Sequence, residues 1–244
     1  MSDYQYAQGG TGVSTDMSVD AGLRSFMLGV FNKMALGLLL SAVLAFVTAT
    51  VEPINALIFG TPLYYVVAFG PIAILLISSF VMKNPSPAAS GIIYWSVVSL
   101  IGAGMGALLM VYGGRPDGML IVAKAFAITS AAFGGLALWG YTTKKDLSGF
   151  GTFLIMGLIG IILASVVNMF MQSPMMHFII SVGGVLVFAG LTAFDTQRLK
   201  HTYYQLGGDQ RSMAVATNFG ALSLYLDFVN MFQFILALMS GGDD

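Results

Sequence analysis

Seven long apolar segments, separated by short polar breaks, constrain the fold more than any other feature of this sequence. Of the 244 residues, 57% are hydrophobic and only 9% are charged, which excludes an ordinary soluble domain. The hydrocarbon core of a membrane is about 30 Å thick, so one helical crossing needs about 20 apolar residues. Segments of this kind cover residues 26–51, 63–82, 88–112, 117–141, 150–171, 175–197 and 213–239. The sequence therefore predicts an all-α membrane protein with seven transmembrane helices, whose surroundings are the lipid bilayer.

The polar breaks leave no room for a second folded domain. Residues 1–22 are rich in Gly, Ser, Thr and Asp, and they carry no basic residue that could form the positive region of a signal peptide. We expect them to form a disordered, polar, cytoplasmic tail. Residues 23–244 are expected to form a single seven-helix transmembrane domain.

The distribution of basic residues predicts how the helices are oriented in the membrane. Lys and Arg are concentrated in cytoplasmic loops of membrane proteins. Seven crossings place two basic residues on one side, Arg115 and Lys124, and eight on the side of the amino terminus: Arg24, Lys33, Lys83, Lys144, Lys145, Arg198, Lys200 and Arg211. We therefore expect a cytoplasmic amino terminus, an external carboxyl terminus and a location in a bacterial inner (plasma) membrane.

Composition also excludes several classes of function. The net charge of −1 argues against a nucleic-acid partner, because such a partner calls for a basic surface. The sequence has no Cys, so disulfides, thiolate metal sites and Cys nucleophiles are excluded. We expect no bound cofactor. Gly102, Gly104 and Gly106 lie within an apolar segment without a preceding strand, so they indicate close helix packing rather than a phosphate-binding loop.

One carboxylate lies near the middle of the last apolar segment. A charged side chain at this depth costs at least about 2.5 kcal/mol, so it normally faces the interior of a helix bundle. At 100° per residue, Gly220, Ser223 and Asn230 fall within about 60° of Asp227, and together they form a polar stripe along one face. We therefore expect the last helix to be central and to keep its Asp227 face away from lipid.

A second carboxylate, Asp195, lies near the cytoplasmic end of the sixth apolar segment. Residue spacing leaves two interpretations open: a local ion pair with Arg198 or Lys200 at the membrane interface, or a site shared with Asp227. If the two carboxylates meet, they titrate as a unit and, when ionised, attract a cation such as Ca²⁺. Residues that could complete the cation pathway are Thr192, Ser223 and Asn230. Depth argues against the pairing, because Asp195 falls about 15 Å beyond the centre of its segment at 1.5 Å per residue.

Three sequence motifs resemble those of the Bax inhibitor-1 (transmembrane Bax inhibitor motif) family. The motifs are Phe194-Asp195-Thr196-Gln197, Lys144-Lys145-Asp146-Leu147-Ser148, and the stretch from Leu224 to Phe232 around Asp227. The resemblance covers the chain from about residue 26 to its end. It implies a fold in which two groups of three helices enclose the last helix, and a pH-sensitive calcium leak through the membrane. It also implies that Asp195 and Asp227 form one site that senses protons, binds Ca²⁺ transiently and gates the leak.

In relatives, a basic residue at the end of the second helix reaches the aspartates. Its position here is that of Lys83, which becomes a candidate counter-ion. A Lys cannot form the two-pronged carboxylate contact of an Arg, so we expect a weaker contact.

The residues leave alternative functions open. A proton-coupled cation exchanger would use the same acids, and a regulatory protein that binds an integral-membrane partner, such as a protease, would keep the acids as polar contacts between helices. Two Asp in late helices also occur in presenilin-like intramembrane proteases. The Gly-x-Gly-Asp and Pro-Ala-Leu motifs of those enzymes are absent here, so we expect no enzymatic activity.

Overall fold

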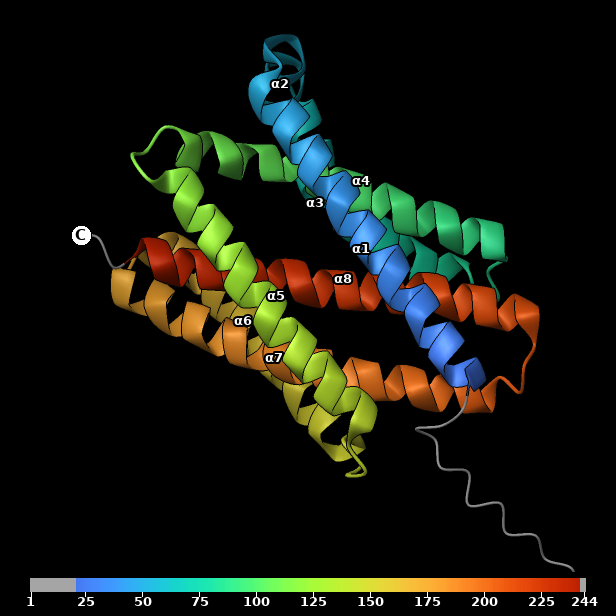
Figure 1. Cartoon of the computed structure of the whole chain (residues 1–244). Coiled ribbons are helices and arrows are strands. Elements are labelled where there is room, and N and C mark those ends of the chain that lie inside the picture. Colours follow the sequence, from blue (N-terminus) through green and yellow to red (C-terminus); the bar gives the residue numbers. More distant parts are fainter. Residues whose placement is uncertain (1–20, 242–244) are drawn as a thin grey trace, which may run out of the picture.

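The computed structural model describes residues 21–241, which form helices joined by short loops (Figure 1). Seven of the helices in this part of the chain are long and apolar enough to cross a membrane, which confirms the predicted fold class. The helices are α1 (Ala21–Thr50), α2 (Glu52–Phe59), α3 (Leu63–Val81), α4 (Pro87–Gly113), α5 (Gly118–Thr142), α6 (Ser148–Met171), α7 (Pro174–Gln205) and α8 (Gln210–Ser240). The predicted disordered tail lies outside the described residues, except that α1 already begins at Ala21.

Two differences between the helices and the predicted segments bear on the site and its surroundings. The connection after α1 contains the short helix α2, which hydropathy did not predict. Helix α7 continues past the apolar segment to Gln205, because the polar residues that follow are compatible with a helix. The chain then turns at Gly207 and Gly208, which both have positive φ angles of 57° and 85° that favour glycine. The extended α7 changes the depth of Asp195, as described below.

The long helices form two groups around α8. Helix α4 packs against α1 and α3, and α7 packs against α5 and α6. Helix α8 contacts α1, α4, α5 and α7, and it is the most buried of the seven spanning helices. This arrangement agrees with the two three-helix groups implied by the family resemblance. Helices α3 and α6 are the least buried of the spanning helices and pack mainly on α4 and α7. The first and last described residues lie at opposite ends of the bundle (Figure 1).

Glycines allow α1 and α4 to cross at close range. A Cβ atom built on Gly102 would lie 2.6 Å from the Cα atom of Ser41, and one built on Gly106 would lie 3.2 Å from the carbonyl oxygen of Ala45. Thr48 of α1 donates a hydrogen bond to the carbonyl oxygen of Ala103 in α4 (3.0 Å). The structure therefore confirms that these glycines serve helix packing.

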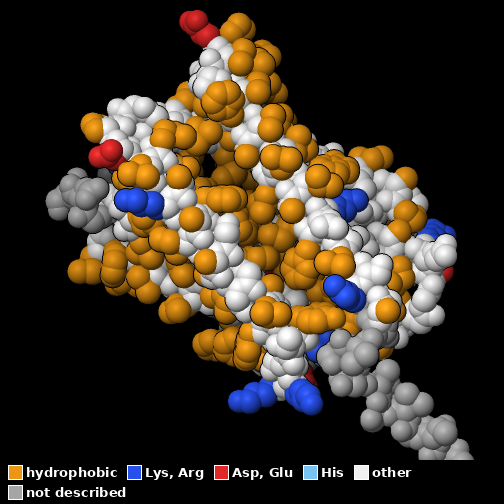
Figure 2. All heavy atoms as spheres, in the orientation of Figure 1, with side chains coloured by type: hydrophobic (Ala, Val, Ile, Leu, Met, Phe, Trp, Pro, Cys, Tyr) orange, Lys and Arg blue, Asp and Glu red, His pale blue; other side chains and the backbone are white. Residues whose placement is uncertain are grey.

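Many large apolar side chains are exposed along the spanning helices. Figure 2 shows hydrophobic side chains across the face between the helix ends, with most Lys and Arg side chains near those ends. Large apolar residues such as Phe46, Phe80 and Phe170 are more than half exposed. A soluble monomer rarely exposes apolar area on this scale, whereas a lipid-facing surface requires it.

Candidate functional site: an acidic cavity beside the last helix

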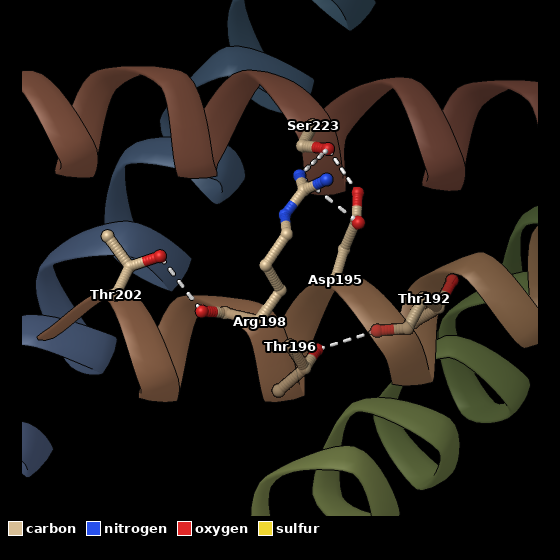
Figure 3. A network of polar contacts seen from close by, with 6 residues as sticks. All are labelled: Thr192, Asp195, Thr196, Arg198, Thr202 and Ser223. Atoms are coloured by element: carbon tan, nitrogen blue, oxygen red, sulfur yellow. Dashed lines mark hydrogen bonds and ion pairs between the residues drawn. The ribbon is translucent and has the colours of Figure 1, made fainter. Parts of the chain in front are cut away.

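Asp195 joins α7 to α8 through a small polar network (Figure 3). Its side chain is buried and accepts a hydrogen bond from the hydroxyl of Ser223 in α8. Arg198, one turn further along α7, places Nη2 at 3.2 Å from Oδ1 of Asp195 and donates to Oγ of Ser223 at 3.3 Å. The carboxylate is therefore buried, while the guanidinium that pairs with it is about half exposed.

Asp227 lies one helical turn beyond Ser223 in α8 and is also buried. Asp195 and Asp227 line one cavity of about 560 Å³. The remaining lining comes mainly from apolar residues of α6, α7 and α8. We call this space the acidic cavity. Within residues 21–241, Oδ2 of Asp227 is a buried oxygen without a hydrogen-bond partner.

The depth mismatch expected between the two carboxylates is much smaller in the structure. Asp195 is level with Ser223, and Asp227 lies four residues further along α8, or about 6 Å at 1.5 Å per residue. Asp195 lies closer to the middle of its helix than the apolar segment indicated, because α7 extends to Gln205.

Both interpretations of Asp195 hold in part. The local ion pair with Arg198 is present, and the same carboxylate faces the cavity that Asp227 lines. Lys200 does not take part, because its ammonium donates to the carbonyl oxygen of Tyr141 at the end of α5 (2.7 Å). A positive charge is favourable there, since the carboxyl end of a helix carries partial negative charge.

The other predicted site residues occupy different surroundings. Asn230 lines the acidic cavity and donates from Nδ2 to the carbonyl oxygen of Leu226 (2.7 Å). Thr192 is fully buried, donates to the carbonyl oxygen of Phe188 (2.8 Å), and does not line the cavity. Lys83 is exposed in the loop after α3, a helix that packs mainly against α4. Among the described residues, the structure therefore places Arg198 rather than Lys83 beside the carboxylates.

The acidic cavity does not hold the ligand set of a resident metal ion. No cluster of three or more His, Asp or Glu residues with this capacity occurs within the described part of the chain. Two carboxylates, a hydroxyl and an amide oxygen on one side of a cavity form an open set of oxygen ligands. Oxygen ligands are those that hard cations such as Ca²⁺ prefer.

Gln197 has a structural role that the sequence analysis did not identify. Its buried amide accepts a hydrogen bond from the backbone N–H of Leu147 (2.8 Å) and donates one to the carbonyl oxygen of Lys145 (2.7 Å). The Phe194–Gln197 motif thus fixes the loop between α5 and α6, which is itself part of a sequence motif. The only sequence signal for this contact was that the two motifs occur together.

Replacing Gln197 with Leu is expected to lower the thermal stability of the protein in detergent. The substitution leaves a buried N–H and a carbonyl oxygen without partners, at a cost of about 1–3 kcal/mol. Thermal unfolding of the purified variant measures the loss. Gln205→Leu is the matched control, because Gln205 is exposed at the end of the same helix. Equal unfolding temperatures for the two variants would contradict the proposed role of the Gln197 hydrogen bonds in stabilising the α5–α6 loop.

The fold and this site define a multi-pass helical membrane protein with a buried pair of carboxylates between its last two helices. Comparison with known proteins gives the same class. Residues 23–244 match the family described as Inhibitor of apoptosis-promoting Bax1. The chain is 54% identical to an uncharacterised protein of Caulobacter vibrioides over 99% of both chains. It is 35% identical to inner membrane protein YbhL of Escherichia coli strain K12, over 89% of this chain and 92% of that one.

This protein belongs to the Bax inhibitor-1 family. The resemblance found in the three sequence motifs is thereby confirmed. The similarity to an inner membrane protein, together with the seven apolar helices, supports a multi-pass protein of the inner membrane. No enzyme name occurs among the relatives described above.

Proposed function

We propose that the protein provides a passive, pH-sensitive path for calcium ions across the bacterial inner membrane, controlled by protonation of Asp195 and Asp227. The observation that carries this proposal is that two buried carboxylates from successive helices line one cavity. In the proposed orientation the amino terminus is cytoplasmic and the carboxyl terminus external, because basic residues concentrate on the amino-terminal side.

The unpaired oxygen of Asp227 supports a role for protons and cations. A buried polar atom without a hydrogen bond is costly, and a buried charge without a partner is more so. Binding a proton, water or a cation removes this cost. Two carboxylates in one cavity repel each other when both are ionised, so in this proposal binding at one changes binding at the other and the pair responds to pH as a unit.

Arg198 supplies the counter-charge in this proposal. Its guanidinium contacts both Asp195 in α7 and Ser223 in α8, so it connects the two helices that carry the acids. A cation that approaches Asp195 competes with Arg198, and protonation of Asp195 weakens the ion pair. Either event loosens the contact between α7 and α8 and couples occupancy of the site to helix movement.

Calcium efflux from proteoliposomes across a pH series tests the proposal. We expect vesicles that contain the protein to release calcium down its gradient faster than protein-free vesicles, at a rate that changes with pH. Imposing a proton gradient at equal calcium concentrations tests the exchanger alternative, which would then drive calcium uphill. If the protein passes no more calcium than protein-free vesicles do, the proposal fails and a regulatory role with an integral-membrane partner is favoured.

A further inference from the structure

A second cavity, of about 460 Å³, lies beside α8 at the end of the bundle where α8 finishes. It is lined by residues close to the ends of their helices, including Tyr112 near the end of α4, Asn168 near the end of α6 and His177 near the start of α7. We call it the distal cavity. Its lining carries several polar side chains, namely those of Tyr112, Ser165, Asn168, His177, Ser181, Asn230 and Gln233.

The distal cavity adjoins the acidic cavity. Both are lined by Ser165 of α6 and by Asn230 and Phe234 of α8. Along α8, the residues that face these two spaces recur every three or four positions, so they form one continuous face of the helix. The face includes Ser223, Asp227, Asn230 and Gln233. A polar stripe therefore runs from the acidic cavity toward the far end of α8.

Gln233 gives the distal cavity an exposed polar group within the membrane-spanning region. Its side chain is exposed although it lies within a membrane-spanning helix. An exposed amide in contact with lipid would leave its hydrogen-bonding groups unsatisfied, so polar residues in spanning helices face a protein interior or a water-filled space. Because Gln233 lines the distal cavity, water in that cavity can satisfy its amide.

Phe234 occupies the boundary between the two cavities. Its ring stacks on that of Phe188 in α7, with centroids 6.0 Å apart and planes inclined by 28°. Gly184 provides the space for this ring, because a Cβ atom there would lie 2.4 Å from it. The aromatic side chain is thus held between α7 and α8 at the boundary that the two cavities share.

We infer that the two cavities are successive parts of one path for hydrated cations, and that Phe234 is the barrier between them. This inference rests on the proposed function. It adds a barrier at Phe234 and an opening of the path at the distal cavity. Asn230, at the boundary, offers an uncharged amide oxygen to an ion that passes the ring. The neutral oxygen ligands of the distal cavity suit a cation that keeps most of its hydration shell.

The absence of Cys from the sequence permits a direct test by cysteine accessibility. Single Cys residues are introduced in the full-length protein at Gln233 and, separately, at Leu226. Leu226 lines the acidic cavity but not the distal cavity. A membrane-impermeant, charged thiol reagent is then added on the side of Ser240. We expect Gln233→Cys to react and Leu226→Cys to be protected. Val182→Cys is the matched control and should not react, because Val182 is exposed at a similar depth but lines neither cavity.

Phe234→Ala is expected to open the barrier. In this background Leu226→Cys should react from the side of Ser240, and calcium efflux should rise several-fold. Phe232→Ala is the control, because Phe232 is buried against Phe126 of α5 and lines neither cavity. The inference is overturned if Gln233→Cys is unreactive, or if Phe234→Ala gives the same labelling as Phe232→Ala. Labelling does not depend on calcium, so a protein that labels as expected but passes no calcium would refute the proposed function and leave the path intact.

Discussion

Proteoliposomes that carry the Asp227→Asn variant are expected to release calcium at a rate that no longer changes with pH. Asn has nearly the same shape as Asp but cannot bind or release a proton in this pH range. The substitution also removes one of the two carboxylates from the acidic cavity, which Asp195 lines as well. We expect the same loss of pH response for Asp195→Asn, which in addition deprives Arg198 of its ion-pair partner.

Calcium efflux measured at a series of pH values checks this prediction, with the wild type and a matched control beside the variants. Asp117→Asn is suitable as the control, because Asp117 is exposed in the loop before α5. Its φ angle of 59° is one that Asn tolerates well. A pH profile of unchanged shape in both site variants would contradict proton gating, even if the absolute rates fell.

Gly102→Ala is expected to cause a large loss of stability. The added Cβ would lie 2.6 Å from the Cα atom of Ser41, so α1 and α4 would have to move apart. Separation also disturbs the hydroxyl of Ser41, which lies 2.7 Å from that of Tyr225 in α8. Overpacking of this kind typically costs about 1–3 kcal/mol, and the loss of the polar contact adds to it.

The unfolding temperature of the purified variant in detergent measures this effect. Gly134→Ala is the matched control, because it introduces the same methyl group into a spanning helix at a position where no atom beyond the adjoining backbone lies within 4 Å. We expect the control to unfold near the wild-type temperature. Equal unfolding temperatures for the two variants would show that the α1–α4 crossing accommodates a larger residue.

Side-chain chemistry along the chain was sufficient to predict several features of this protein. Long apolar segments can satisfy their backbone groups in a membrane only as helices, so their number predicted seven crossings. Asp227 could be recognised as an inward-facing residue, because exposing a carboxylate of a spanning helix to lipid costs free energy. The glycines of α4 could be assigned to helix packing, since small residues permit a close approach of two backbones.

Other features depended on contacts between distant segments. Hydropathy ended the sixth segment near residue 197, whereas α7 continues to Gln205 and thereby brings Asp195 level with Ser223. The basic residue beside the carboxylates is Arg198, although the family resemblance pointed to Lys83. The side-chain direction of Gln197 toward the α5–α6 loop also could not be read from its position in the motif.

The sequence by itself determined the membrane environment, the helical class and the presence of two acids. Composition and spacing are sufficient for this, because backbone polar groups must be hydrogen-bonded within a helix, and charged side chains must face away from lipid. Only the tertiary structure decided that both acids line one cavity, that Arg198 pairs with Asp195 and that Phe234 lines both this cavity and a second one. These features depend on the relative depth and rotation of α6, α7 and α8. Depth and rotation are set by packing between helices that residue periodicity along one helix does not specify.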